Sequence, residues 1–138
     1  MTDPELIRKR LAHIATCLSD LRRLARPEVL EHDIRERRFV EHTLQLAIQA
    51  ALDVASHIVA DQRLGEPVTH RRLFELLGEA DILDEHLSVR LGDMAAFRNV
   101  LVHGYIEVDL EIVKDVLANR LTDLNELCVR LSRLLDAF

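Results

Sequence analysis

The chain has 138 residues, of which 49% are hydrophobic and 30% charged, with 4 Gly, 3 Pro and a formal net charge of −6. This length suits one domain with a sizeable core, and the composition excludes a disordered chain. The acidic balance provides no long-range attraction for nucleic acid, so RNA binding would require a local basic site.

The N-terminus and the absence of a long apolar run predict a cytoplasmic protein. The N-terminus reads MTDPELIRKRLA, which lacks the apolar centre of a signal peptide, and no apolar run approaches transmembrane length. Cys17 and Cys128 lie in helical patterns far apart in the sequence. We therefore expect two small core residues, and no disulfide, in a reducing compartment.

Hydrophobic periodicity predicts five helices and no strand. The first carries an apolar stripe from Ile7 to Ala25 and ends before Pro27. The second covers about residues 30–62 and ends at the run LGEPV, residues 64–68. Its apolar stripe consists of Val40, Leu44, Ala47, Ala51, Val54 and Ile58.

The remaining helices are separated by residues that commonly begin or end helices. The third is expected over residues 70–77, with Thr69 as its N-cap and Gly78 as its end. The fourth covers about residues 84–102, and Asp109 is expected to cap the fifth. The short connections predict an all-α bundle of antiparallel helices, with residues 1–138 forming a single domain. The predicted core positions of the fifth helix are Ile112, Val116, Leu121, Leu124, Leu127, Leu131 and Leu134.

Residues 98–105 read RNVLVHGY, and periodicity explains only the aliphatic members of this segment. A histidine can move a proton on or off a ribose hydroxyl near neutral pH, and an arginine can hold a phosphate with two hydrogen bonds. With Asn99 to orient them, Arg98 and His103 could cleave RNA through its own 2′-OH without a metal ion. The structural alternative is that Arg98 pairs with a carboxylate, His103 caps the helix end and Tyr105 is half-buried.

The spacing of these residues sets a geometric condition. In a straight helix the positions of Arg98 and His103 are about 140° apart. Both can serve one site only if the helix bends or ends between them, or if a second copy of the chain contributes. Gly104 is expected to end the helix, and extended backbone beyond it could bring Tyr105 to the same side as His103.

The segment fits an Arg-Asn-x-x-x-His-x-Tyr signature and so resembles the HEPN-domain family, specifically the HepT-type toxins of bacterial and archaeal toxin–antitoxin pairs. The surrounding sequence agrees, and the resemblance extends over about residues 30–135. The segments similar to the family's, in the same order, are LQLAIQAALDVASHIVAD (44–61), PVTHRRLFELLGEADIL (67–83) and MAAFRNVLVHGY (94–105).

This resemblance implies a five-helix HEPN-type bundle that forms a homodimer, in which two copies of the motif line one cleft. Members of the family are typically metal-independent endoribonucleases. It implies that Arg98 and His103 are catalytic and that Asn99 assists them, with RNA and not DNA as substrate and with no cofactor. It also implies a partner, a minimal nucleotidyltransferase antitoxin (MntA-like), which transfers AMP to Tyr105 and so blocks RNA entry by charge and bulk.

Asp53 and His57 are a second candidate pair, one turn apart on the second helix. With His42 and Gln49 they form a polar stripe. Such a pair could orient a catalytic base or begin a metal site, but a buried hydrogen-bonded pair that fixes helix packing or the dimer interface is the more common outcome. The resemblance adds slight weight to a supporting role near the cleft. The histidines show no metal-binding spacing, so we expect no metal site.

Two basic clusters are open to the same choice between function and solvation. Arg35, Arg37 and Arg38 lie near the start of the second helix, and Arg71 and Arg72 near the start of the third. Each cluster could contact RNA or an acidic partner, but charge runs are more often solvated faces.

Two functions therefore remain open. The first is a homodimeric ribonuclease toxin neutralised by a nucleotidyltransferase, which the joint presence of Arg98, Asn99 and His103 favours. The second is a non-catalytic helical module that docks a nucleotidyltransferase, which the net charge of −6 favours.

Overall fold

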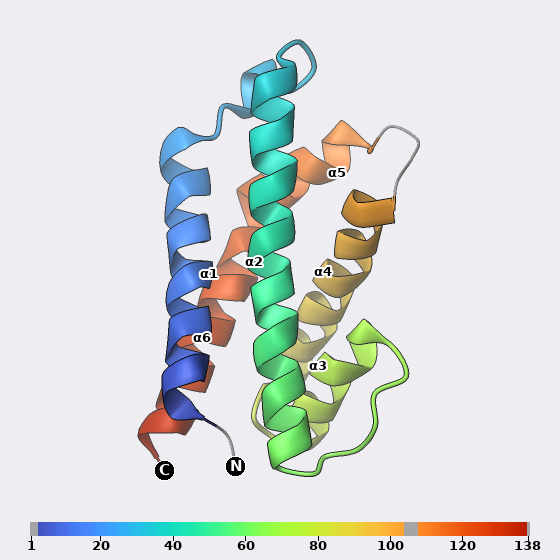
Figure 1. Cartoon of the computed structure of the whole chain (residues 1–138). Helices are drawn as coiled ribbons and strands as arrows, with labels where there is room; N and C mark the ends of the chain where they lie inside the picture. Colours follow the sequence, from blue (N-terminus) through green and yellow to red (C-terminus); the bar gives the residue numbers. More distant parts are fainter. Residues whose placement is uncertain (1–2, 104–107, 138) are drawn as a thin grey trace.

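The computed structural model describes residues 3–103 and 108–137, and the regular elements in these residues are all helical (Figure 1). The elements are α1 (Pro4–Leu24), a 3-10 turn (Pro27–Val29), α2 (Ile34–Asp61), α3 (His70–Glu79), α4 (Glu85–His103), α5 (Leu110–Asp115), a π-helical turn (Val116–Arg120) and α6 (Leu121–Asp136).

Short polar side chains set the starts of the helices by accepting hydrogen bonds from backbone N–H groups of the first turn. Thr69 and Asp109 cap α3 and α5, as the sequence predicts. Asp3 and Asp84 cap α1 and α4 in the same way. Asp33 caps α2, so this helix begins at residue 34 and not near residue 30.

The helices form an antiparallel bundle, as short connections require. In Figure 1, α1 and α2 stand side by side, α6 passes behind them, and α3 and α4 pack together on the other side. The start of α1 and the end of α6 lie at the same end of the bundle. The fold class predicted from periodicity is therefore confirmed.

Helix α2 is the central element of the core. Its predicted apolar stripe, from Val40 to Ile58, is buried throughout. By length and composition alone α2 could cross a membrane, which the sequence prediction missed, and 61% of that apolar window is buried within the bundle. A buried window of this kind is typical of a core helix.

Gly78 does not end α3, contrary to the prediction from the sequence. It lies inside the helix, which continues to Glu79, and Asp81 adopts the left-handed conformation just beyond it with φ 60°. Gly78 instead permits a close helix contact, because a Cβ atom at this position would lie 2.7 Å from Oγ of Ser88 on α4.

The predicted fifth helix consists of α5, the π-helical turn and α6 in direct succession, and its hydrogen-bonding pattern changes at the π-helical turn. Val116 and Leu121 are both buried, yet a spacing of five residues does not fit an α-helical stripe. One wider turn with i→i+5 bonding brings both residues back to the same face. Ile112, which the sequence places in the core, is 49% exposed, and the neighbouring Val113 is buried in its place.

Both cysteines are free, as expected. Burial raises the pKa of the Cys128 thiol to about 11. Burial, with a smaller contribution from Asp20, also raises the pKa of Cys17. Thiols held protonated in this way behave as small apolar residues.

The contact between Gly78 and Ser88 predicts a specific stability loss. Gly78→Ala should lower the free energy of unfolding by about 1–3 kcal/mol, because α3 and α4 must separate to admit the methyl group. Urea denaturation measures this difference. Gly92→Ala is the matched control, because its Cβ would meet only the flexible Arg71 side chain, at 3.0 Å from Cγ. Equal losses for the two variants would contradict the close-contact role of Gly78.

Candidate functional site

Helix α4 carries three of the four polar residues of the motif. It runs without a break from Glu85 to His103, so the helix does not end between Arg98 and His103. Asn99 follows Arg98 on the same helix. The side chain of His103 lies outside the described residues, as does all of Tyr105. The expected helix end at Gly104 also falls outside them.

Two polar contacts hold α4 in its rotational position. On one side, the buried Ser88 hydroxyl donates to the Phe74 carbonyl oxygen of α3 at 2.7 Å. On the other side, Arg90 Nε donates to Asp123 Oδ1 of α6 at 2.8 Å, and the Asp123 side chain is only 5% exposed. This hydrogen bond raises the pKa of Arg90. Together these contacts determine which way the later residues of α4 face.

Arg98 is half-buried and has no hydrogen-bond or ion-pair partner among the residues that the structure describes. Its Nε atom is buried from solvent and unpaired within this set. The structural alternative, in which a carboxylate neutralises Arg98, therefore finds no support there. Buried donors without partners are rare in folded proteins. The buried Nε atom is itself closed to a ligand, but the other guanidinium nitrogens are neither buried nor paired among the described residues, so they can bind an anion such as a phosphate.

Asn99 is exposed and faces a hollow of about 510 Å³. The hollow lies between the later part of α2, the connection before α3 and the first turn of α3. Its other lining residues are Ser56, Pro67, Val68, Thr69, His70 and Leu73. The sequence analysis missed this hollow, because nothing in the local pattern joins residues from three separate segments.

Asp53 and His57 do not form the buried pair expected from their spacing. Gln49 Nε2 donates to Asp53 Oδ1 at 2.9 Å, one turn earlier on α2. His57 is exposed and unpaired within the described part of the chain. The described residues also contain no group of three or more potential metal ligands. The expected absence of a metal site stays a prediction.

The basic clusters are largely engaged within the fold. Arg37 donates to two backbone carbonyl oxygens of the preceding turn, both at 3.2 Å. Arg71 pairs with Asp93 at 2.7 Å, and Arg72 pairs with Glu79 at 2.9 Å. These arginines are therefore structural in this chain. The residues of the first cluster that stay exposed are Arg35 and Arg38.

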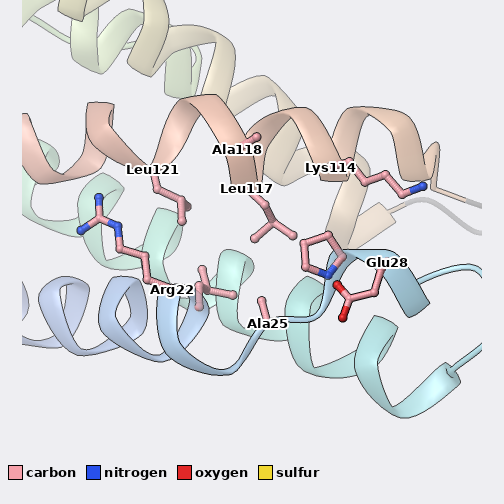
Figure 2. Close-up of a pocket in the computed structure, with 9 residues that line it drawn as sticks. Arg22, Ala25, Glu28, Lys114, Leu117, Ala118 and Leu121 are labelled. Atoms are coloured by element: carbon pink, nitrogen blue, oxygen red, sulfur yellow. The ribbon is translucent and has the colours of Figure 1, made fainter.

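A larger hollow, about 590 Å³, lies away from the motif between the end of α1 and the α5–α6 segment (Figure 2). Figure 2 shows Lys114 and Glu28 at one end of it and Arg22 further along. Lys114 is already paired with Glu31 at 2.9 Å. This hollow contains none of the candidate residues, so its size alone does not identify the functional site.

The fold and the site define the class of the protein: an antiparallel helical bundle that presents an arginine with no carboxylate partner among the described residues, with an asparagine beside it, on a helix that continues to a histidine. Residues 14–131 match the family described as "HepT-like: Ribonuclease HepT-like". The chain belongs to this family, which confirms the resemblance found in the sequence.

Curated relatives cover most of the chain. The chain is 30% identical over 123 residues to the mRNA nuclease HepT of Shewanella oneidensis, an alignment that covers 88% of this chain and 92% of the relative. It is 29% identical over 109 residues to the tRNA nuclease HepT of Aphanizomenon flos-aquae, which covers 78% and 74% of the two chains.

Solved structures agree with the fold over nearly the whole chain. The tri-AMPylated HEPN toxin of Shewanella oneidensis, in complex with its MNT antitoxin, superposes with a TM-score of 0.87 at 29% identity, covering 96% of this chain and 99% of that one. A toxin–antitoxin complex with AMP-PNP gives a TM-score of 0.88 at 28% identity, covering 94% and 98%.

Proposed function

We propose that this protein is the toxin of a type VII-like toxin–antitoxin pair, a cytoplasmic single-domain endoribonuclease that requires no metal ion or cofactor. The observation that carries this proposal is that Arg98 has no partner among the described residues and stands next to Asn99 on a helix that extends to His103. The nuclease names of the two HepT relatives support the same reaction.

The reaction follows from the residue types. Arg98 binds the scissile phosphate and stabilises the additional negative charge on its oxygens as the transition state forms. His103 accepts the proton of the ribose 2′-OH, whose oxygen attacks the phosphorus atom. The 5′-oxygen of the next nucleotide leaves and takes up a proton, which produces a 2′,3′-cyclic phosphate and a 5′-hydroxyl. Asn99 orients the phosphate or the histidine, and Asp53 and His57 are supporting candidates on α2.

The proposed cleft is formed jointly by two copies of the chain. Because α4 does not end between Arg98 and His103, the roughly 140° between their positions separates the two groups within one copy. A homodimer places Arg98 of one copy against His103 of the other. Exposed apolar side chains on the two helices that carry the candidate residues support such an interface, since Leu46 of α2 is 38% and Val100 of α4 is 49% exposed.

The antitoxin is a separate minimal nucleotidyltransferase, MntA-like, which adds AMP to Tyr105. The solved complex of a tri-AMPylated HEPN toxin with an MNT antitoxin supports this partner for this chain. Each AMP unit adds a phosphate charge and a bulky nucleoside next to the cleft. The added charge repels the RNA backbone, so modification blocks substrate entry.

A second candidate is a non-catalytic module that docks a nucleotidyltransferase. The observation that favours it is the net charge of −6, which opposes RNA binding. Under this alternative the segment 98–105 is a docking surface for the partner.

Loss of either catalytic group should abolish cleavage. We expect purified protein, unmodified at Tyr105 by intact mass, to cut tRNA or total RNA in excess EDTA, and His103→Ala and Arg98→Ala each to lower the rate about 10²–10⁴-fold. His86→Ala is the matched control, because His86 is exposed at the other end of α4. Cleavage that persists in both motif variants would place the activity elsewhere. No cleavage by the wild type would favour the docking module.

Subunit mixing tests the shared cleft. Arg98→Ala and His103→Ala chains, each inactive alone, should regain roughly a quarter of wild-type activity when co-refolded, because half of the dimers are mixed and each retains one intact Arg–His pair. Co-refolding Arg98→Ala with the Arg98→Ala/His103→Ala double variant is the control and should restore nothing. If the first mixture also stays inactive while mixed dimers form, the two groups do not act across the interface.

A variant at Tyr105 should separate AMP modification from RNA cleavage, because only the modification requires the tyrosine hydroxyl. Tyr105→Phe should keep most of the RNase activity, because the phenol takes no part in the proton transfer, and should lose AMP transfer by the nucleotidyltransferase. Mass spectrometry after incubation with the antitoxin and ATP measures the transfer. Full AMP addition to the Phe variant would show that another residue is the acceptor.

A further inference from the structure

The lining of the hollow beside Asn99 combines apolar and polar side chains. The apolar ones are Pro67, Val68 and Leu73, of which Val68 is 93% exposed. The polar ones include the Asn99 amide and the His70 imidazole, which are both exposed and unpaired among the described residues. Apolar contacts together with hydrogen-bonding groups match the chemistry of a nucleobase, which stacks through its faces and pairs through its edge.

Three further features fit a small polar ligand. Ser56 contributes a hydroxyl that is unpaired within the described residues. Thr69 Oγ1 accepts a hydrogen bond from the Arg72 backbone N–H at 3.2 Å, which leaves the hydroxyl proton free to donate. The volume of about 510 Å³ is within the range of small-ligand pockets.

The charge around the hollow also distinguishes it. No carboxylate is among the lining residues that the structure describes, although Glu66 precedes Pro67 in the connection. Three other hollows on the described surface each include a carboxylate, respectively from Glu28, Glu41 and Asp93. On a chain with net charge −6, a hollow whose described lining lacks a carboxylate is a favourable place for part of an anionic polymer.

We infer that this hollow binds one base of the RNA, that of a nucleotide adjacent to the cleaved bond, an inference that rests on the proposed function. Arg98 and Asn99 are consecutive on α4 and their side chains leave the helix about 100° apart, so a base held at Asn99 belongs to a nucleotide close to the phosphate held at Arg98. His70 supplies a stacking surface and a hydrogen bond, and Asn99 reads the polar edge of the base. The hollow thereby determines which nucleotide flanks the cut.

Two pairs of variants test the hollow. His70→Ala removes the stacking ring, and His86→Ala is its control on another part of the surface. Val68→Asp adds a charge to the apolar part of the lining, and Val68→Asn has nearly the same shape as Val68→Asp without the charge. All three positions are exposed, so the four variants should fold, and their ¹⁵N–¹H spectra check this.

Binding is measured with AMP, CMP, GMP and UMP, each titrated into ¹⁵N-labelled protein. At least one nucleotide should shift the backbone amide signals of residues 69–70 and the side-chain amide of Asn99. His70→Ala should weaken this binding about fivefold or more, the usual size of a lost base–ring stack, and His86→Ala should not. Val68→Asp should weaken it more than Val68→Asn.

Sequencing the cleavage products of the same variants measures the base preference next to the cut, which His70→Ala should reduce. Nucleotide shifts that are absent, or unchanged in His70→Ala, overturn the base site. So does an active His70→Ala enzyme with an unaltered preference. A wild type that binds a nucleotide in the hollow but cuts no RNA overturns the ribonuclease and leaves the base site standing.

Discussion

The hydrogen-bonded ion pair between Arg90 and Asp123 is the interaction on which the candidate site depends. Asp123 is almost fully buried, and its second carboxylate oxygen has no partner among the described residues, so Arg90 is its main compensation there. Leaving such a carboxylate without a cation costs about 3–5 kcal/mol. The pair therefore holds α4 against α6 in one rotational position, and this position decides how Arg98 is presented.

The π-helical turn makes this pairing compatible with the core. Asp123 lies in the first turn of α6, directly after the turn at Val116–Arg120. A continuous α-helix without the wider turn could not bury both Val116 and Leu121 on one face. The residues after them would also be rotated about the helix axis, so Asp123 would not point toward Arg90. On the opposite side of α4, the absence of a side chain at Gly78 allows α3 to approach closely enough for Ser88 to bond Phe74. The site thus depends on features placed well outside the motif.

Electrostatic repulsion between added phosphate groups and RNA explains how the proposed ribonuclease activity would be regulated. The chain is acidic overall, and several of its arginines are neutralised by nearby carboxylates, as with Arg71 and Arg72. Arg98 has no such neighbour within the described residues, so local positive charge persists where a phosphate would bind. A site that relies on so little positive charge is sensitive to a few added negative charges. Under the proposed function, adenylylation of Tyr105 would therefore inhibit RNA binding through a few added negative charges.

The sequence by itself determined the helical class, the antiparallel order, the caps at Thr69 and Asp109, and the motif that identifies the family, because each depends on residues close together in the chain. Only the tertiary structure decided the role of Gly78, the partner of Asp53, the exposure of Ile112 and the hollow beside Asn99. It also decided that Arg98 finds no partner among the described residues. A glycine ends a helix or admits a neighbouring helix according to what packs against it, and here that is Ser88 of α4. Long-range packing creates these features, and no local pattern encodes which distant side chains meet.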